Sequence, residues 1–336
     1  MKSYIVLGVS LLALSATPVL AQSNGSTVSQ SGSSAVATVT QSGSNSQSDV
    51  TQTGGGTVTV DQSGSVGSTS NVTTSADDRP PESTVSVTQT DNGSGGTASG
   101  EANIATVVQD NVNGFGETGT GSTVSVDQNK NRVGASNFAS VQQGRNAVSG
   151  QVDIDQEGAD NSAIYSAFTS TDNDAFIDQV GVNNSAIVSQ NFQAGSAIAD
   201  VMQTNTSGLS ENKVTIEQAS AGFSADPAQF ARGAEAYAVQ DGTGNTSTIR
   251  QTGFSASSSA ANYASSTQNG DDHTSLIEQT GTDATAIVNQ FGDHNSSTVL
   301  QSGVGNTATV TQNSDNNLST VTQSGSGNTA TVTQGQ

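Results

Sequence analysis

The sequence predicts an all-β chain folded as a β-solenoid, in which strand–turn–strand rungs stack along one axis. Three observations predict this fold. Glutamine recurs every 11 residues over long stretches, small or apolar residues alternate with Thr, Ser and Asp before each glutamine, and Gly often follows two positions later. A period of two is that of a strand, and Gly beside Ser, Asn or Asp is typical of a turn. Two 11-residue half-repeats then make a rung of about 22 residues, and the stacked rungs predict a cross-β, fibre-forming architecture.

The glutamines set the register of the repeat. A β-branched aliphatic residue usually stands two positions before the glutamine, a small residue four before and Asn six before, which gives the unit Asn-x-Ala/Ser-x-Val-x-Gln-x-Gly. The glutamines that keep the 11-residue spacing within their runs are Gln30, Gln41, Gln52, Gln179, Gln190, Gln240, Gln251, Gln268, Gln279, Gln290, Gln301, Gln312, Gln323 and Gln334. The asparagines in phase with them are Asn184, Asn245, Asn295, Asn306, Asn317 and Asn328. The predicted turn glycines are Gly32, Gly43, Gly181, Gly253, Gly281, Gly292, Gly303 and Gly325.

These residues are predicted to have a structural role. In a strand of period two, the Asn, the small residue, the β-branched residue and the Gln all point to the same face. A buried side-chain amide is costly unless it is paired, and stacking in register places each amide beside its counterpart in the next rung. The Gln and Asn rows are therefore predicted to form ladders that fix the register and stabilise the stack rung by rung.

Composition excludes several classes of function. Hydrophobic residues make up 31% of the chain and aromatic residues 4%, which is too little for a thick core and fits only a thin core running along a repeat. The net charge of −21, with eight scattered Lys and Arg, argues against nucleic acid and anionic membrane as partners. There is no cysteine for a disulfide, a thiolate metal site or a nucleophile.

We therefore predict no enzymatic activity, no cofactor and no metal site. His273 and His294 are the only histidines, and both are interpreted as surface residues in turns. Carboxylate pairs such as Asp153 and Asp155 are interpreted as solvated acidic rows, because they lie on one strand face without a partner base.

The N-terminus has the pattern of a secretory signal peptide. Lys2 precedes an apolar stretch from Ile5 to Leu14, and small residues lead to a cleavage site after Ala21. The apolar stretch is shorter than the ~20 residues that span a bilayer, and no other segment is apolar enough to do so. Residues 1–21 are therefore predicted to be removed, and loss of Lys2 takes the net charge from −21 to −22. The mature chain is predicted to be extracellular.

Four regions are predicted along the chain: the signal peptide at 1–21, regular repeats at 22–62, degenerate acidic repeats with loop insertions at 63–239, and regular repeats at 240–336. Residues 76–82 contain two prolines, which lack the donor that a ladder strand needs. Residues 113–121 are Gly-rich, and residues 219–233 contain an Asp-Pro pair that fits a helix start. We interpret these segments as loops that leave the solenoid. The other interpretation is a disordered linker between two short solenoids.

Charge is concentrated in the middle of the chain. Only Asp49 is charged between residues 22 and 60, and only Asp293 and Asp315 carry a formal charge after residue 290. Stacked Asp rows repel one another, so the near-neutral ends are predicted to associate while the acidic middle slows association. Deleting residues 291–336 is expected to slow fibre formation more than deleting an equal central length.

The repeat resembles that of the curlin family, the subunits of bacterial curli fibres. The family pattern runs Gln-x-Gly-x2-Asn-x-Ala-x3-Gln, and it is matched from Gln179 to Gln190, from Gln301 to Gln312 and from Gln323 to Gln334. The clearest matches lie in residues 22–62 and 240–336. In two respects the chain differs from the family's major subunit: its repeats begin almost directly after the predicted cleavage site, and it is longer than a five-repeat subunit.

The resemblance implies a secreted subunit that crosses the periplasm and the outer membrane unfolded and polymerises into amyloid fibres of the biofilm matrix. Its implied partners are further copies of itself, a nucleator subunit and an outer-membrane export pore, without membrane insertion. Two alternatives stay open. A monomeric solenoid adhesin would need polar caps on its terminal rungs, and none is evident at the C-terminus. An ice-binding solenoid would use the recurring outward Thr-x-Thr pairs, but Ser, Asp and insertions interrupt them.

Overall fold

The computed structural model describes residues 13–14, 24–32, 34–76, 83–91, 103–111, 122–130, 136–144, 150–168, 173–191, 197–219, 233–253 and 261–335. Every regular element in this part of the chain is a β-strand. The strands form two parallel sheets that together make a β-solenoid, as the 11-residue period predicts.

Successive strands alternate between the two sheets, so that each strand pairs with the strand two places along the chain. The sheet of odd-numbered strands contains β1 (Ala13–Leu14), β3 (Ala35–Ser44), β5 (Gly56–Val66), β7 (Thr84–Asp91), β9 (Thr123–Lys130), β11 (Gln151–Ala159), β13 (Asp174–Val182), β15 (Ile198–Asn205), β17 (Glu235–Asp241), β19 (Tyr263–Asn269), β21 (Thr285–Phe291), β23 (Thr307–Gln312) and β25 (Thr329–Gln334). The sheet of even-numbered strands contains β2 (Gly25–Ser31), β4 (Gln47–Thr53), β6 (Thr69–Ala76), β8 (Ile104–Asn111), β10 (Phe138–Gln143), β12 (Ser162–Phe168), β14 (Asn184–Asn191), β16 (Asn212–Ala219), β18 (Thr246–Thr252), β20 (Thr274–Thr282), β22 (Ser296–Val304) and β24 (Leu318–Ser326).

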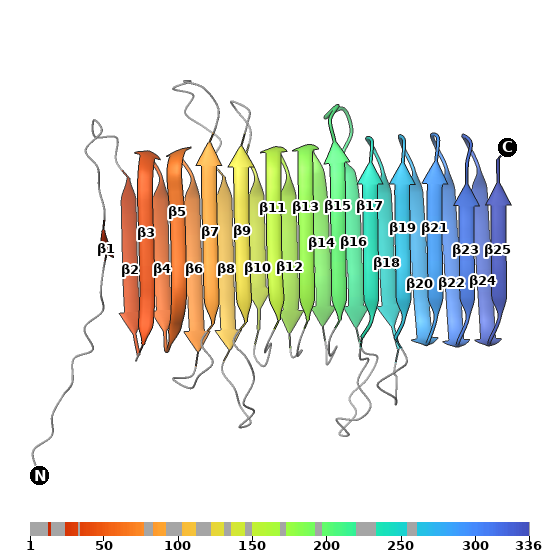
Figure 1. Ribbon diagram of the computed structural model, residues 1–336, viewed down its shortest axis with the longest axis horizontal. Helices are drawn as coiled ribbons and strands as arrows, with labels where there is room; N and C mark the ends of the chain where they lie inside the picture. The colour runs from red at the N-terminus through yellow and green to blue at the C-terminus, as the bar shows by residue number, and fades with distance from the viewer. Residues whose placement is uncertain are drawn as a thin grey trace, which may run out of the picture.

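A strand of the even sheet and the next strand of the odd sheet make one rung, from β2 with β3 to β24 with β25. The rungs lie side by side along the long axis of the molecule, with the N-terminal rung at one end and the C-terminal rung at the other (Figure 1). Parallel pairing keeps equivalent residues in line. Ala264 lies opposite Ala286, for example, and Gln268 lies opposite Gln290.

Side chains alternate between the space enclosed by the two sheets and the outer faces. β14 shows this fully, because every second residue from Asn184 to Gln190 is buried and the residues between them are half-buried. The enclosed space holds one continuous, narrow apolar cluster of Ala, Val and Ile side chains, with Tyr165 among them, along the stack. A core this narrow needs few apolar residues, which agrees with the low hydrophobic content of the chain. Each rung contributes part of it, so the stabilisation by apolar burial is distributed along the stack.

The middle of the chain continues both sheets. Strands from β7 to β17 pair in register with their neighbours on both sides, so the interpretation of two short solenoids joined by a linker is wrong. The predicted loop segments at 76–82, 113–121 and 219–233 fall almost wholly outside the described residues. The 22-residue rung holds from Gln268 onward, where bonded glutamines are 22 residues apart. In the middle the corresponding separation reaches 39 residues, between Gln89 and Gln128.

The predicted signal peptide lies outside the described residues except for β1, a two-residue strand that pairs with Thr38 and Val39 of β3. No helix long and apolar enough to span a membrane occurs in the part of the chain that the structure describes.

Candidate functional site

The glutamines of the odd sheet form one unbroken ladder. Each Nε2 donates a hydrogen bond of 2.7–2.9 Å to the Oε1 of the glutamine in the next rung. The ladder runs through Gln41, Gln62, Gln89, Gln128, Gln156, Gln179, Gln203, Gln240, Gln268, Gln290, Gln312 and Gln334. Every bond has the same direction, with the donor on the N-terminal side.

The glutamines of the even sheet form a ladder that is interrupted twice. Its segments are Gln30 with Gln52, Gln109 with Gln143, and the run Gln190, Gln218, Gln251, Gln279, Gln301 and Gln323. Thr74 occupies the first gap, and neither its Oγ1 nor the buried Oε1 of Gln109 has a hydrogen-bond partner. Ala167 occupies the second gap, where the buried Tyr165 hydroxyl donates to Gln190 Oε1 at 2.9 Å. An alanine therefore does not leave Gln190 unpaired, because a tyrosine replaces the usual β-branched residue beside it.

The ladder glutamines also tie the two sheets together. Gln290 Nε2 donates to the Thr274 carbonyl on the even sheet, and Gln301 Nε2 donates to the Thr285 carbonyl on the odd sheet, each at 3.0 Å. Because an amide has two N–H groups, one glutamine can donate a hydrogen bond to the glutamine of the next rung and another to a backbone carbonyl of the opposite sheet. The side chains that fix the register along the axis thus also fix the separation of the sheets.

Asparagines form a second row, at the start of the even-sheet strands. In this row a backbone or side-chain N–H of each rung donates to the side chain of the rung before it. The row runs through Asn103, Asn137, Asn161, Asn184, Asn212, Asn245, His273, Asn295 and Asn317. Asn306 and Asn328 make the equivalent contact on the odd sheet, at 3.1 Å.

The predicted turn glycines lie where the chain leaves a strand. Gly181, Gly281, Gly303 and Gly325 have positive φ, as do Gly32 and Gly292. A side chain on Gly281 would place Cβ 1.9 Å from the Gly303 carbonyl oxygen, so the stacking of turns itself requires glycine. Gly253 makes the same close approach, to the Gly281 carbonyl oxygen. Gly43 lies within β3, where the register with β5 shifts.

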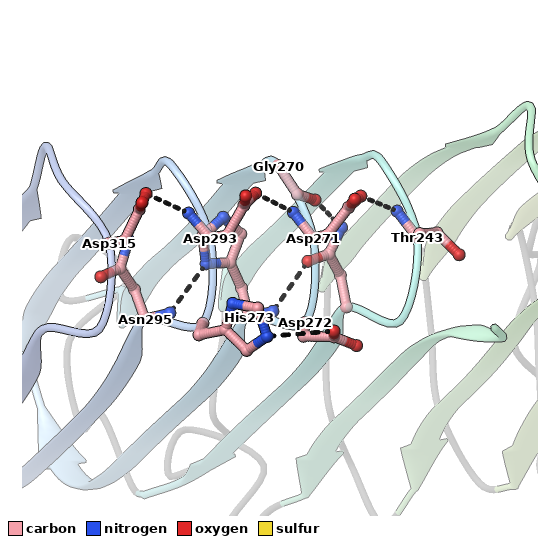
Figure 2. A network of polar contacts seen from close by, with 10 residues as sticks. Thr243, Gly270, Asp271, Asp272, His273, Asp293, Asn295 and Asp315 are labelled. Carbon is pink, nitrogen blue, oxygen red and sulfur yellow. Dashed lines mark hydrogen bonds and ion pairs between the residues drawn. The ribbon is translucent and has the colours of Figure 1, made fainter. Parts of the chain in front are cut away.

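His273 is a correction to the sequence interpretation. It was expected on the surface, but its side chain is fully buried in the asparagine row. The turn edge of the same rungs carries Asp271, Asp293 and Asp315, each of which accepts a backbone N–H of the preceding rung (Figure 2). His294 is exposed as expected, with Nε2 3.5 Å from Asp272 Oδ2.

The acidic rows lie on the outer face of the odd sheet. Asp127, Asp155 and Asp178 are directly opposite one another on β9, β11 and β13. Partial burial raises the pKa of each of these carboxyls, and repulsion from nearby Asp and Glu adds to the shift. The pKa of Asp200 is raised for the same reasons, with Asp178 as the neighbour. Burial is the larger cause of these raised pKa values, and repulsion between neighbouring carboxylates adds to it.

Eight ladder glutamines do not appear in the 11-residue spacing: Gln62, Gln89, Gln109, Gln128, Gln143, Gln156, Gln203 and Gln218. A shorter signal would have found them, because each follows a Val or Ile by two positions. Changes in the number of residues between strands, one fewer before Gln62 and more elsewhere, shift the long period and leave this local pair intact.

The two end rungs have almost the same sequence. Residues 26–32 of β2 and its turn read Ser-Thr-Val-Ser-Gln-Ser-Gly, and residues 319–325 of β24 read Ser-Thr-Val-Thr-Gln-Ser-Gly. Residues 37–41 of β3 and 330–334 of β25 are identical, Ala-Thr-Val-Thr-Gln. The ends also leave the core open, because Val28, Ala330 and Val332 are only partly buried.

Comparison with protein families finds a match to the C-terminal part of the chain. The model of the curlin associated repeat matches residues 281–313 and 305–335, which span β21 to β25. No curated protein sequence matches the chain.

Proposed function

We propose that this chain, whose residues 281–335 are curlin repeats on a β-solenoid, is a secreted structural subunit that assembles head to tail into curli-like amyloid fibres. A curlin-repeat β-solenoid is a structural fold and not a known enzyme family. The partners in this proposal are further copies of the chain, with a nucleator subunit and an outer-membrane export pore on the way to an extracellular matrix.

The single observation that carries the proposal is the match between the two end rungs. If β2 of one copy is placed beside β24 of another, Ser26, Val28 and Gln30 meet Ser319, Val321 and Gln323. This is the register in which β22 already pairs with β24. The contact between two copies, which we call the seam, then has the same strand register as the contact between successive rungs within one chain.

The ladders give this seam a direction. Every glutamine bond along the axis runs from Nε2 of one rung to Oε1 of the next. The C-terminal rung thus presents Nε2 of Gln323 and Gln334, as hydrogen-bond donors, to the next copy. The N-terminal rung of that copy presents Oε1 of Gln30 and Gln41 as acceptors. A contact between two different surfaces of identical copies does not close on itself when the copies are related by translation, and it gives a filament.

Burial and charge favour the same contact. The inward residues of β25 are only half-buried, while the equivalent residues of β14 are fully buried. Stacking would bury them at roughly 25 cal/mol per Å² of apolar surface. None of β2, β3, β24 and β25 contains a charged residue, so the strands that would meet in this contact bring no carboxylates together.

The test is fibre formation by residues 22–336, diluted from denaturant at neutral pH. We expect a lag, growth of thioflavin T fluorescence, and fibre reflections at ~4.7 Å and ~10 Å. A β-rich monomer that stays soluble at high concentration would contradict the proposal and favour a solenoid adhesin.

Two pairs of variants locate the seam. Val332→Asp and Val28→Asp each place a carboxylate in the inward row of an end rung, where stacking would bury it without a partner. Both should slow growth at least tenfold. Their controls, Thr331→Asp and Thr27→Asp, add the same charge on the outer face of the same strand and should grow much faster than the inward variants. Equal growth of the inward and outward variants would contradict end-on stacking.

The outward threonines support ice binding only weakly. β23 and β25 place Thr307, Thr309 and Thr311 opposite Thr329, Thr331 and Thr333. On β21, however, the last two of these positions are Ile287 and Asn289. A flat Thr array therefore ends after two strands in this region.

A further inference from the structure

His273 occupies a position that is otherwise asparagine from Asn103 to Asn317 of the even sheet. Asn295, in the next rung, shows what this position does. Its Oδ1 accepts the backbone N–H of Asn317 at 2.8 Å, and its Nδ2 donates to the carbonyl of Phe291, four residues earlier, at 2.8 Å. The position thus requires one acceptor that faces the next rung and one donor that faces the end of the preceding strand, which is β21 for Asn295.

The imidazole of His273 reproduces both contacts. Nδ1 lies 3.2 Å from the backbone nitrogen of Asn295, and Nε2 lies 3.2 Å from the carbonyl oxygen of Asn269, again four residues earlier. The Asn295 N–H is the donor of the first contact, so Nδ1 must carry a lone pair. A carbonyl oxygen accepts in the second, so Nε2 must carry the proton. The position therefore admits only the neutral Nε2–H tautomer.

We propose that His273 is a proton-sensitive joint between the body of the solenoid and its C-terminal rungs. Protonation would put a hydrogen on Nδ1 facing the Asn295 N–H, so that two donors meet and the hydrogen bond between the residues that precede β20 and β22 is lost. An asparagine at the same position has no such second state, since its amide does not titrate.

The charged groups near His273 lie in and beside the turns that precede the even-sheet strands. The charged or titratable groups on the described elements around the ring are Asp241, Asp271, Asp272, Asp293 and His294, which are exposed or half-buried. Oxygens of Asp271 and Asp293 accept backbone N–H groups, and Asp272 pairs with His294. The neighbouring rungs contribute neutral groups: Asn245 Oδ1 accepts the backbone N–H of His273, and the backbone N–H of Asn295 donates to the ring. Both ring nitrogens of the buried imidazole contact backbone groups, at Asn269 and Asn295, and neither contacts one of these carboxylates.

The sign of the pH effect follows from proton binding. In an unfolded chain a histidine takes up a proton as the pH falls through ~6.5. If the folded rung excludes that proton, the unfolded or opened state binds more protons, and stability rises with pH. Opening of the joint should then become about tenfold more favourable for each pH unit below ~6.5.

The test compares His273→Asn with the wild type in residues 22–336, using the protection of the Asn295 amide against hydrogen exchange between pH 7.5 and pH 5. Protection factors correct for the pH dependence of exchange itself. We expect protection in the wild type to fall at least tenfold over this range, and protection in His273→Asn to stay constant within about threefold. The control is His294→Asn, which removes the exposed histidine and should behave as the wild type does.

A second measurement does not depend on a folded variant. In chain labelled with ¹⁵N histidine, the two ring nitrogens of His273 should show the Nε2–H tautomer at pH 7.5, with His294→Asn assigning the signals. A protonated Nδ1 at pH 7.5, or the same pH profile in His273→Asn and the wild type, would overturn the proposal. Neither result would affect the end-on assembly proposed above, which is tested at neutral pH.

Discussion

The C-terminal rungs (residues 261–335) and the middle rungs (residues 83–253) have the same kinds of residue on the inward faces of their strands. They differ in the number of residues between the strands. Bonded glutamines are 22 residues apart in the C-terminal rungs, and between 23 and 39 apart across the middle of the odd sheet. The glutamine ladder of the odd sheet passes through both without a break. The difference shows that the rung is defined by the short strand unit, and that extra residues are accommodated outside it.

The two regions differ most on their outer faces. The middle rungs stack Asp127, Asp155 and Asp178 in register, whereas the strands β21 to β25 contain no carboxylate at all. Both regions are therefore stabilised by the same glutamine ladder, whereas charge repulsion acts mainly in the middle rungs. The variants below test this contrast, from the largest expected effect to the smallest.

Loss of a ladder amide should be equally damaging in both regions. Gln156 and Gln290 each accept one ladder bond and donate two hydrogen bonds. Replacing either by Leu leaves those buried partners unpaired and should cost about 2–4 kcal/mol. Urea unfolding of freshly diluted chain, followed by circular dichroism, measures this loss. Asn289→Leu, on the outer face of β21, is the control and should change stability by less than about 0.5 kcal/mol. A tolerant Gln156 with a sensitive Gln290 would break the equivalence.

Acid should stabilise the middle rungs through their carboxylates. The folded-state pKa values of Asp127, Asp155, Asp178 and Asp200 are raised, so the folded state binds more protons as the pH falls. Their destabilising effect is thus present at neutral pH and is lost as the pH falls through these raised values. Because the row is partly exposed, solvent screening limits each contribution to below about 1 kcal/mol.

The triple substitution Asp127→Asn, Asp155→Asn and Asp178→Asn should reproduce at pH 7 the stability that acid gives to the wild type. It should also shorten the lag of fibre formation. Hydrogen exchange resolves the regions, and the amides of β23 should show no such gain in acid. If the triple variant were less stable than the wild type at pH 7, repulsion in this row would be refuted.

Repair of the ladder gap at Thr74 should stabilise the chain by about 1 kcal/mol. Thr74→Gln offers an N–H to the unpartnered Oε1 of Gln109 and extends the segment that begins at Gln30. A rise in the urea midpoint is the expected result. Thr73→Gln, one residue earlier on the outer face, is the matched control, and an equal rise in both variants would exclude the ladder as the cause.

Buried serines give the smallest expected effect. At one inward position of the even sheet, β10, β12 and β14 have Ala139, Ala163 and Ala186, whereas β20 and β22 have Ser275 and Ser297. The hydroxyls of these two serines are buried without a hydrogen-bond partner. Ser275→Ala and Ser297→Ala should therefore raise stability by about 0.5–1 kcal/mol each. Unfolding midpoints that fall in both variants would show that these hydroxyls are paired.

Much of the fold could be predicted because its signals are local. The Val-x-Gln pair sets a strand of period two, and the Gly two residues after Gln301 marks a turn that stacks on the turn of the next rung. Parallel in-register pairing follows, since only that register brings Gln279 beside Gln301 and buries Ile277 and Val299 together. The functional roles of the ladder residues in assembly stay predictions until the end-rung variants are measured.

Other features of the ladders could not be predicted, because they depend on which residues of the neighbouring rungs a side chain contacts. No pattern shows that Ala167 is compensated by Tyr165, since the compensation acts on Gln190 in the following rung. The burial of His273 was missed for a similar reason. Its position in the asparagine row is set by pairing with Asn245 and Asn295, 28 and 22 residues away.

By itself, the sequence determined the unit: a short strand with an inward row of small, β-branched and amide side chains, repeated often enough to stack and charged mainly in its middle. These properties follow from residues within one repeat, where spacing alone decides which face a side chain takes. Only the tertiary structure decided that the ladder is continuous in one sheet and interrupted in the other, which insertions the stack tolerates, and which titratable group is enclosed. Those properties depend on contacts between rungs, and a hydrogen bond needs a partner in place as well as a suitable side chain.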